Sequence, residues 1–194
     1  MNDSSTGGYL TPAAATPPEE DLELDRLLVQ MVRGISGLPK DKVRPRWQPT
    51  TPKQPPGPDE NWCAVGITTQ TPDASPAITH DAAGDGRDVY WRHQGIELLC
   101  TFYGSEAKMR AQALADGLAI PQNREELGRH EMAVVGTGDI RAVPDLVNNV
   151  WVRRYDMTVF LRRKISRSYS VLNLLNAGVT THTAAGSVTT GISP

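Results

Sequence analysis

Histidines and carboxylates are the residue types from which a catalytic or metal site in this sequence would be built. Three aspartates lie in DAAGDGRD, at positions 81, 85 and 88, but the 1-3-5 ligand spacing of a calcium loop and its closing glutamate are missing. No histidine has a partner at ligand spacing such as HxxxH or HxxE; the four are His80, His93, His130 and His182. We therefore expect a solvated loop, surface or strand histidines, and no metal ion.

Other signatures of catalysis are also missing from the chain. Gly136-Thr137-Gly138 lacks the third glycine and the helix start of a dinucleotide-binding loop. The sequence has no GxSxG, no GxxxxGK[ST], and no Cys/His pair in a catalytic context. Cys63 and Cys100 lie far apart in apolar, strand-like segments, which predicts buried free thiols. We expect a protein that is not an enzyme and that binds no cofactor.

The remaining chemical signal is a cluster of positive charge in the segment 150–167. Against the single acid Asp156, this segment carries six basic residues: Arg153, Arg154, Arg162, Arg163, Lys164 and Arg167. They could form a solvated strand face that protects a sheet edge. They could instead pair with the acidic first helix of a neighbouring subunit, or face a polyanion such as DNA. The sequence leaves these alternatives open.

Composition limits the classes of protein that fit. The net charge of -2 argues against a free nucleic-acid-binding domain, which is usually strongly basic. With 17 glycines and 15 prolines among 194 residues, much of the chain is expected to lie outside a packed core. No N-terminal segment of this sequence has a basic n-region followed by an apolar h-region, and no apolar run approaches ~18 residues. We expect a soluble chain that is made in a cytoplasm and has no membrane partner.

Two long segments alternate with period two and predict the main strands that position these residues. Segment 150–167 places most of its apolar residues at odd positions, and segment 87–103 places most of them at even positions. Shorter strands are predicted over 62–68 and 132–135. A strand over 43–47 would lie at an edge, since Pro45 cannot donate a ladder hydrogen bond.

Helical spacing predicts two main helices. Acidic residues precede leucines at helical spacing over 22–36, and Gly37 supplies a stop signal. A second helix over 105–120 would be capped by Ser105 and would bury Met109 in its apolar stripe.

Shorter elements connect these segments. We expect brief helices over 123–127 and 144–149, a loop or hairpin turn over 69–86, and an extended proline-rich loop over 48–61. The expected fold class is α+β, with two main helices packed on a mixed or antiparallel sheet.

Arms are expected at both ends of the core. We divide the chain into an extended N-terminal arm (1–20), an α+β core (21–167) and a C-terminal arm (168–194) that has no charged residue. An uncharged tail either is a floppy terminus or becomes ordered on a neighbouring subunit. Its apolar residues would otherwise be an aggregation hazard. The candidate assembly residues are Tyr169, Val171, Leu172, Leu174 and Leu175.

Several sequence segments together resemble phage neck (tail) terminator proteins. They are the acidic helix that runs into GISGLPKDKVRPRWQP, the strand NWCAVGI and the closing run FLRRKISRSYSVLNLLNAG. The resemblance covers roughly residues 20 to 180. It implies a tail-terminator-like α+β fold and a virion structural protein of a tailed phage or prophage. It brings no catalytic residues.

Partners and location follow from this resemblance as expectations. Similar proteins form a ring, commonly a hexamer, between the head connector and the tail. We therefore expect contacts with further copies of the chain, with the connector or adaptor, with tail proteins, and non-specifically with passing DNA. The expected location is the virion neck, with the host cytoplasm during assembly. Alternatives are a head-closure, tail-completion or tail-tube protein, or an enzyme or binding module of unfamiliar type.

Overall fold

A computed structural model describes residues 2–13, 18–47, 57–174, 177–184 and 186–192. The chain divides into two compact units, each described by itself. The larger unit comprises 18–76 and 92–165; the smaller comprises 1–17, 77–91 and 166–194. Most of the predicted proline-rich loop, and Leu175 of the predicted arm, lie outside the described residues.

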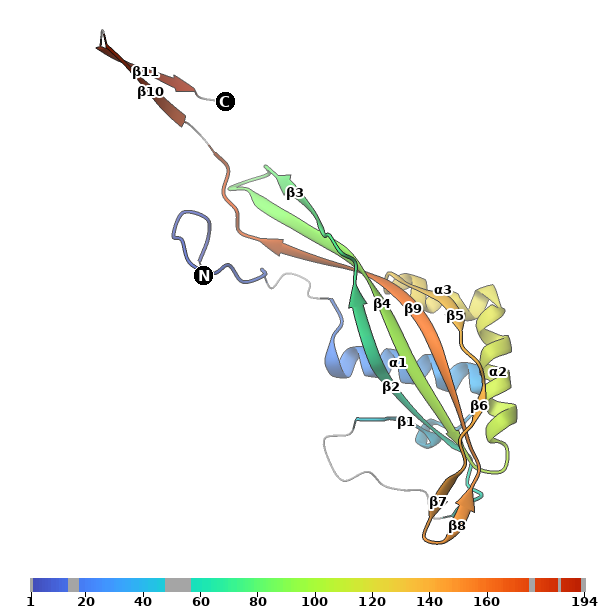
Figure 1. The fold of residues 1–194 in the computed structure, drawn as a ribbon. Helices are drawn as coiled ribbons and strands as arrows, with labels where there is room; N and C mark the ends of the chain where they lie inside the picture. The colour runs from blue at the N-terminus through green and yellow to red at the C-terminus, as the bar shows by residue number, and fades with distance from the viewer. Residues whose placement is uncertain (1, 14–17, 48–56, 175–176, 185, 193–194) are drawn as a thin grey trace. The chain divides into compact units, whose positions relative to one another are not determined.

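The main sheet has the strand order β1-β2-β4-β9-β5, with β3 paired to β4 and β6 paired to β9 (Figure 1). Strands β1 and β2 are parallel, whereas the pairs β2–β4, β3–β4, β5–β9 and β6–β9 are antiparallel. The strands are β1 (Val43–Pro45), β2 (Trp62–Pro72), β3 (Ala77–Asp81), β4 (Arg87–Tyr103), β5 (Met132–Thr137), β6 (Arg141–Ala142) and β9 (Arg154–Tyr169). The helices are α1 (Asp21–Ser36), η1 (Lys40–Lys42), α2 (Ala107–Ala119) and α3 (Pro121–Arg129). The α+β class is confirmed.

Period-two alternation predicts which face of the sheet the helices cover. In the larger unit, β4 buries its even positions from Ile96 to Phe102, and β9 buries its odd positions from Met157 to Ile165. The strand predictions for 87–103 and 132–135 are confirmed, with β5 two residues longer. The strand predicted over 62–68 is confirmed and continues to Pro72.

Helix α1 covers this face through residues spaced i, i+3, i+4, i+7 and i+8. They are Leu24, Leu27, Leu28, Met31 and Val32, all at most 9% exposed. The helix ends as predicted at Gly37, whose φ of 70° is left-handed and whose N–H donates to the carbonyl of Arg33. Leu22, at the start of the predicted stripe, instead lies 57% exposed.

Three local predictions about the second helix and the connections are wrong. Helix α2 starts at Ala107, and the side chain of Asn61, not Ser105, accepts from the N–H of Glu106 at its start (2.8 Å). Met109 is 50% exposed, because the buried stripe consists of alanines and leucines four or three positions apart. The segment 69–86 contains the end of β2 and the whole of β3.

The predicted brief helix over 144–149 is a β-hairpin. Strands β7 (Asp145–Val147) and β8 (Val150–Val152) are antiparallel and are joined by Asn148 and Asn149. Both asparagines have positive φ (49° and 60°), which is the backbone that a tight type I′ hairpin turn requires. The long strand predicted over 150–167 is therefore interrupted at Arg153, whose carbonyl accepts from the N–H of Gly104 (3.1 Å).

The smaller unit contains β3, the start of β4, the end of β9 and a hairpin of β10 (Ala177–Thr183) with β11 (Gly186–Ile192). Its N-terminal segment runs beside the end of β9. The amide of Ser4 donates to the carbonyl of Ser170 (3.1 Å), and the amide of Ala13 donates to that of Ser168 (2.7 Å). These bonds hold both terminal segments to one unit.

A buried cation joins α1 to the sheet in the larger unit. Arg163 lies on the core face of β9, and its side chain is 3% exposed. Its guanidinium donates to the carbonyl of Glu19 (2.6 Å), the carboxylate of Glu20 (2.9 Å) and Oε1 of Gln94 (3.0 Å). A buried charge is tolerated only when it is paired and hydrogen-bonded in this way.

We predict that Arg163→Met lowers the free energy of unfolding by about 3 kcal/mol, because it leaves the partners of the guanidinium unsatisfied. Arg162→Met is the matched control, since the Arg162 side chain is 53% exposed beside a half-exposed Asp73. That variant should cost less than about 1 kcal/mol. Equilibrium unfolding in urea measures both. Equal losses for the two variants would contradict the role given to Arg163.

Candidate functional site

The six basic residues predicted as a site do not form one continuous surface. Arg154, at the start of β9, is neutralised within the chain by Asp156 (2.7 Å) and Asp145 (3.4 Å). Its guanidinium lies 5.9 Å from the centre of the Tyr103 ring. The hydrogen bonds that Arg154 donates to Asp156 raise the pKa of Arg154, so its charge is fixed and its role in this place is structural.

Arg162 and Arg163 point to opposite faces of β9, because successive side chains in a strand alternate. Arg163 faces the helices, whereas Arg162 lies on the uncovered face and pairs with Asp73 (3.0 Å). Lys164 shares the face of Arg162 and is exposed. The acidic start of α1 is thus paired with a basic residue of β9 inside one subunit.

The other two basic residues lie elsewhere. Arg153 is exposed at the junction of β8 and β9, where its Nη1 donates to the carbonyl of Ser105 (3.4 Å). Arg167 is half-buried in the smaller unit. The structure therefore brings together Arg162 with Lys164 on one face, and Arg153 with Arg154 at one junction.

The predicted C-terminal arm starts inside the smaller unit. Tyr169 packs edge-on against Tyr90, with ring centres 6.4 Å apart. Val171 and Leu172 are half-buried, whereas Leu174 is 81% exposed. We call residues 168–174 the arm root. After it, the arm forms the β10–β11 hairpin, in which the exposed side chains of Val179 and Val188 share one face.

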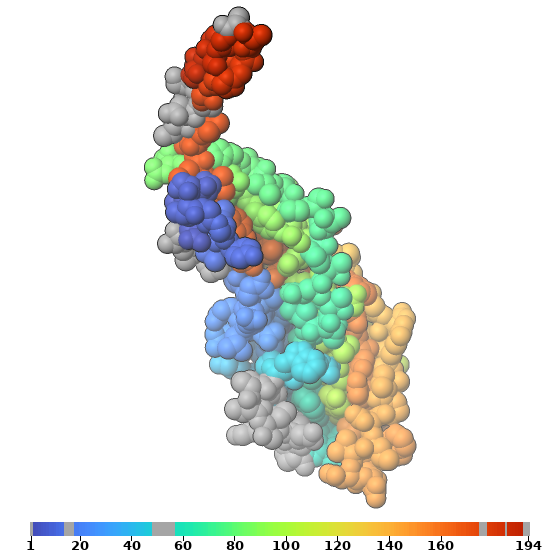
Figure 2. All heavy atoms as spheres, turned by 60° about the vertical axis from the view of Figure 1, so that its left-hand side comes forward, coloured from blue at the N-terminus to red at the C-terminus, as the bar shows by residue number. Residues whose placement is uncertain are grey.

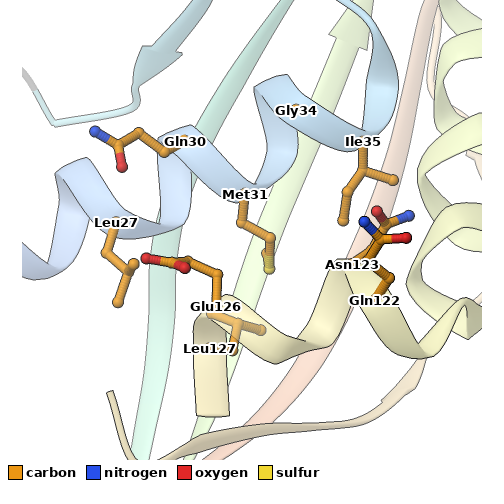
Figure 3. A pocket seen from close by; sticks show the side chains of 9 residues that line it. All are labelled: Leu27, Gln30, Met31, Gly34, Ile35, Gln122, Asn123, Glu126 and Leu127. Carbon is orange, nitrogen blue, oxygen red and sulfur yellow. The ribbon is translucent and has the colours of Figure 1, made fainter. Parts of the chain in front are cut away.

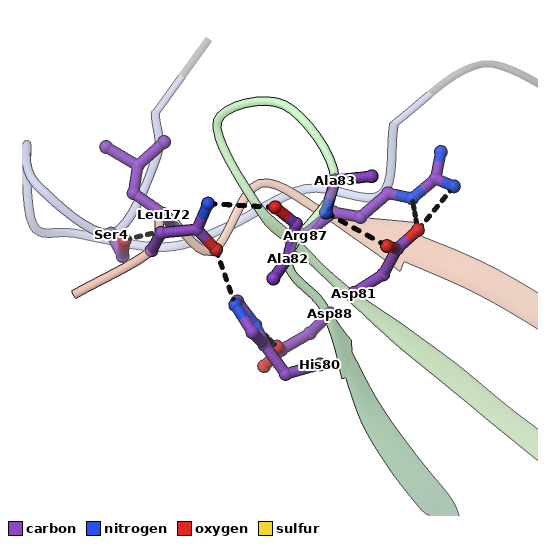
Figure 4. Close-up of polar contacts among 9 residues, drawn as sticks. Ser4, His80, Asp81, Ala82, Ala83, Arg87, Asp88 and Leu172 are labelled. Atoms are coloured by element: carbon purple, nitrogen blue, oxygen red, sulfur yellow. Dashed lines mark hydrogen bonds and ion pairs between the residues drawn. The ribbon is translucent and has the colours of Figure 1, made fainter. Parts of the chain in front are cut away.

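A hydrogen-bond clasp holds the root of this arm to the β3–β4 hairpin (Figure 4). Nδ2 of Asn173 donates to the carbonyls of Ala82 and Gly84 (3.1 Å each), so its Oδ1 is the acceptor. This Oδ1 lies 2.9 Å from Nε2 of His80, whose Nδ1 lies 2.8 Å from Oδ1 of Asp88. Both ring nitrogens of His80 can donate only when the ring is protonated.

The clasp also depends on a close backbone approach. The amide of Asn173 donates to the carbonyl of Asp85 (2.9 Å). A Cβ at Gly86 would lie 2.7 Å from that amide nitrogen, and its φ of 95° disfavours any other residue. The sequence predicts a solvated loop for Asp81, Asp85 and Asp88. These residues instead lie at or beside the β3–β4 turn, to which the arm root is hydrogen-bonded.

Sequence reasoning missed an exposed apolar surface on the β7–β8 hairpin of the larger unit. Leu146 and Trp151 are directly opposite in the ladder and are 54% and 69% exposed. Val143, Val147 and Val150 are also exposed. The signal that could have found it is the Asn148-Asn149 pair flanked by apolar residues, which is typical of a tight hairpin turn.

The larger unit also has two concave surface regions, neither of which is lined by residues of this hairpin. One, between α1 and α3, has a volume of about 270 Å³, and its floor is formed by Leu27, Met31 and Leu127 (Figure 3). The other has a volume of about 340 Å³ and lies between the start of α1, Trp47 and the β2 residues Ile67 and Gln70. Figure 2 shows the cyan segment after β1 at the surface between the blue α1 and the teal β2. We call the second region the α1–Trp47 groove.

Among the described residues, no group of three or more His, Cys, Asp or Glu is placed to hold a metal ion. Cys63 and Cys100 are free and buried, as predicted, and burial raises the pKa of the Cys63 thiol well above its usual value. Within the described part of the chain, no helix is long and apolar enough to span a membrane.

Comparisons with known proteins agree with the resemblance. The family model described as phage neck terminator protein matches residues 22–185. A search of curated proteins gives no match. The matched range contains the whole larger unit from Leu22 onward, and in the smaller unit it includes the clasp and strand β10.

The His80 clasp predicts that the arm root is held more tightly in mild acid. The hydrogen bond to Asp88, followed by that to Asn173, raises the pKa of His80. The stabilisation is therefore complete below the unfolded pKa of about 6.5 and is lost as pH rises through the higher folded value. Asp81, a second acid near His80, has its pKa lowered by hydrogen bonds from the Ala83 amide and the Arg87 side chain, so it stays ionised in this range.

Hydrogen exchange of the Asn173 amide, corrected for its intrinsic pH dependence, measures the effect. We expect protection to fall in the natural chain as the pH rises above about 6.5. His80→Gln should remove this pH dependence. His182→Gln, in the β10–β11 hairpin, is the control and should retain it. Unchanged protection across this range in the natural chain would refute the clasp.

Proposed function

Since this chain belongs to the phage neck terminator family, and is therefore a protein of the virion neck, we propose that its copies form a closed ring there. In this proposal the ring is a hexamer that joins the head connector to the tail, and genomic DNA passes through it. The match over 22–185 is the observation that carries the proposal. The role is structural, with no catalytic residue assigned.

The uncovered surfaces support self-assembly. A ring is built from heterologous contacts, in which two different patches of one chain meet on neighbouring copies. The β7–β8 hairpin and the α1–Trp47 groove are two such patches. Strand β5 lies at the end of the main sheet order, where an extended segment of a neighbour could add a further strand.

We assign the C-terminal arm (168–194) to contacts with a neighbouring subunit or an adjacent ring. A two-stranded hairpin is marginally stable alone, and β10–β11 leaves Val179 and Val188 exposed on one face. The arm has no charged residue to keep it solvated. Contact with another protein surface would cover its apolar side chains and stabilise the hairpin.

We assign the exposed basic residues of β9 to weak electrostatic contacts. Arg162 and Lys164 share the uncovered face of the sheet, where they would meet passing DNA or a neighbouring subunit. Phosphate contacts of this kind carry no sequence specificity and weaken with salt. Such weakness suits a channel through which DNA must move.

Deletion of the gene, followed by complementation, tests the proposal. We expect particles without the gene to contain filled heads that lack attached tails, and the full chain to restore attachment. A chain that ends at residue 167 should keep the larger unit folded but fail to restore tails, because it lacks the assembly arm.

Circular dichroism of the purified truncated chain is the control for folding. Normal tailed particles in the complete absence of the gene would refute the proposed function. Full rescue by the truncated chain would refute only the role of the arm.

A further inference from the structure

The tip of the β7–β8 hairpin exposes more apolar surface than a solvated hairpin requires. Leu146 and Trp151 form a cross-strand pair on one face, and Val147 and Val150 flank the turn. All four side chains are between 37% and 69% exposed. Exposed apolar clusters of this kind mark sites where another protein binds. Trp is also the residue type most enriched among interface side chains that dominate binding.

The α1–Trp47 groove has the complementary apolar character. Leu22 and Trp47 are 57% and 67% exposed at its rim, and Ile67 lies beside them. Leu22 occupies a helix position that the apolar pattern assigns to the core, yet no described element covers it. The groove thus offers an apolar platform for side chains from outside the subunit.

The charges of the two surfaces are also complementary. Beside the hairpin, Arg141 and Arg154 are paired with carboxylates of their own subunit, whereas Arg153 is exposed and donates only to a carbonyl, so its positive charge remains available. The groove is lined by three acids, of which Glu20 is paired with Arg163, so Asp21 and Asp25 supply the negative charge at its rim. Burial and the charge of Asp21 raise the pKa of Asp25, so an arriving cation would relieve crowding of negative charge at this rim.

We propose that the β7–β8 hairpin of one copy docks in the α1–Trp47 groove of the next copy. Leu146 and Trp151 lie against Leu22 and Trp47, and Arg153 beside the hairpin faces Asp21 and Asp25. The inference rests on the proposed ring and names its subunit contact. Because the two surfaces differ, the contact is heterologous and repeats from copy to copy until the ring closes.

The groove between α1 and α3 is a weaker partner for the same hairpin. Its floor residues Leu27, Met31 and Leu127 are at most 9% exposed, so they are already covered within the subunit. Its rim consists mainly of amide side chains, with Glu126 as its one acid. It offers neither exposed apolar side chains to match Trp151 nor an acidic rim to match Arg153.

Cross-linking in phage particles tests the contact. Val150→Cys places a thiol beside the hairpin turn, and Gln70→Cys places one at the α1–Trp47 groove. Both natural cysteines are buried, so a short bis-maleimide should react with the introduced thiols. We expect the double variant to give a ladder of dimers and higher multimers in tailed particles, and each single variant to give none.

Two further substitutions show whether the contact depends on the proposed chemistry. Trp151→Ala in the double-cysteine chain should lower the yield of cross-linked dimer about tenfold or more, as expected for a central interface side chain. Ile120→Ala is the matched control, since this exposed residue lies outside both surfaces. Arg153→Glu and Asp25→Lys should each lower the yield, and the combination should restore it.

The outcomes separate this contact from the ring itself. Tailed particles that contain the chain but give no ladder would overturn the contact and leave the proposed function intact. A ladder from Val150→Cys with Gln122→Cys, in the α1–α3 groove, would also overturn it. Tailed particles that lack the chain would overturn both proposals.

Discussion

Packing of the helices on the sheet depends on neutralising one buried cation, the guanidinium of Arg163. It lies on the core face of β9 and is surrounded by apolar side chains, so it requires acceptors that the strands alone do not supply. The residues that begin α1 supply a carbonyl and a carboxylate, and Gln94 of β4 supplies an amide oxygen. This requirement fixes the start of α1 above β4 and β9.

Patterns in the sequence predict the elements that bury one face. Alternation predicts β4 and β9, and helical spacing predicts α1, because each presents a regular apolar stripe. Strand β3 has no buried residue and so carries no such signal. The β7–β8 hairpin was mistaken for a brief helix because its conformation depends on two asparagines at positive φ rather than on a buried face.

Only part of the candidate site was predictable. The sequence shows where each charged residue lies, but not which residue it pairs with in the fold. Arg163 is at an odd position of β9, so alternation places it on the apolar face, but its partner Glu20 is 143 positions away in the sequence. Composition alone predicts an uncharged arm, whereas the clasp between Asn173 and His80 joins residues 93 positions apart. Surfaces left uncovered by the fold, such as Trp151 and Leu22, emerge only when the packing of every other element is known.

In the proposed ring, these surfaces would contact further copies of the chain and its neighbours in the neck. Electron cryomicroscopy of the intact particle tests this central claim most directly. We expect a closed ring of this chain between head connector and tail, with the β7–β8 hairpin of each copy in contact with its neighbour. Density for the chain at another position in the particle, or for isolated copies that do not contact one another, would contradict it.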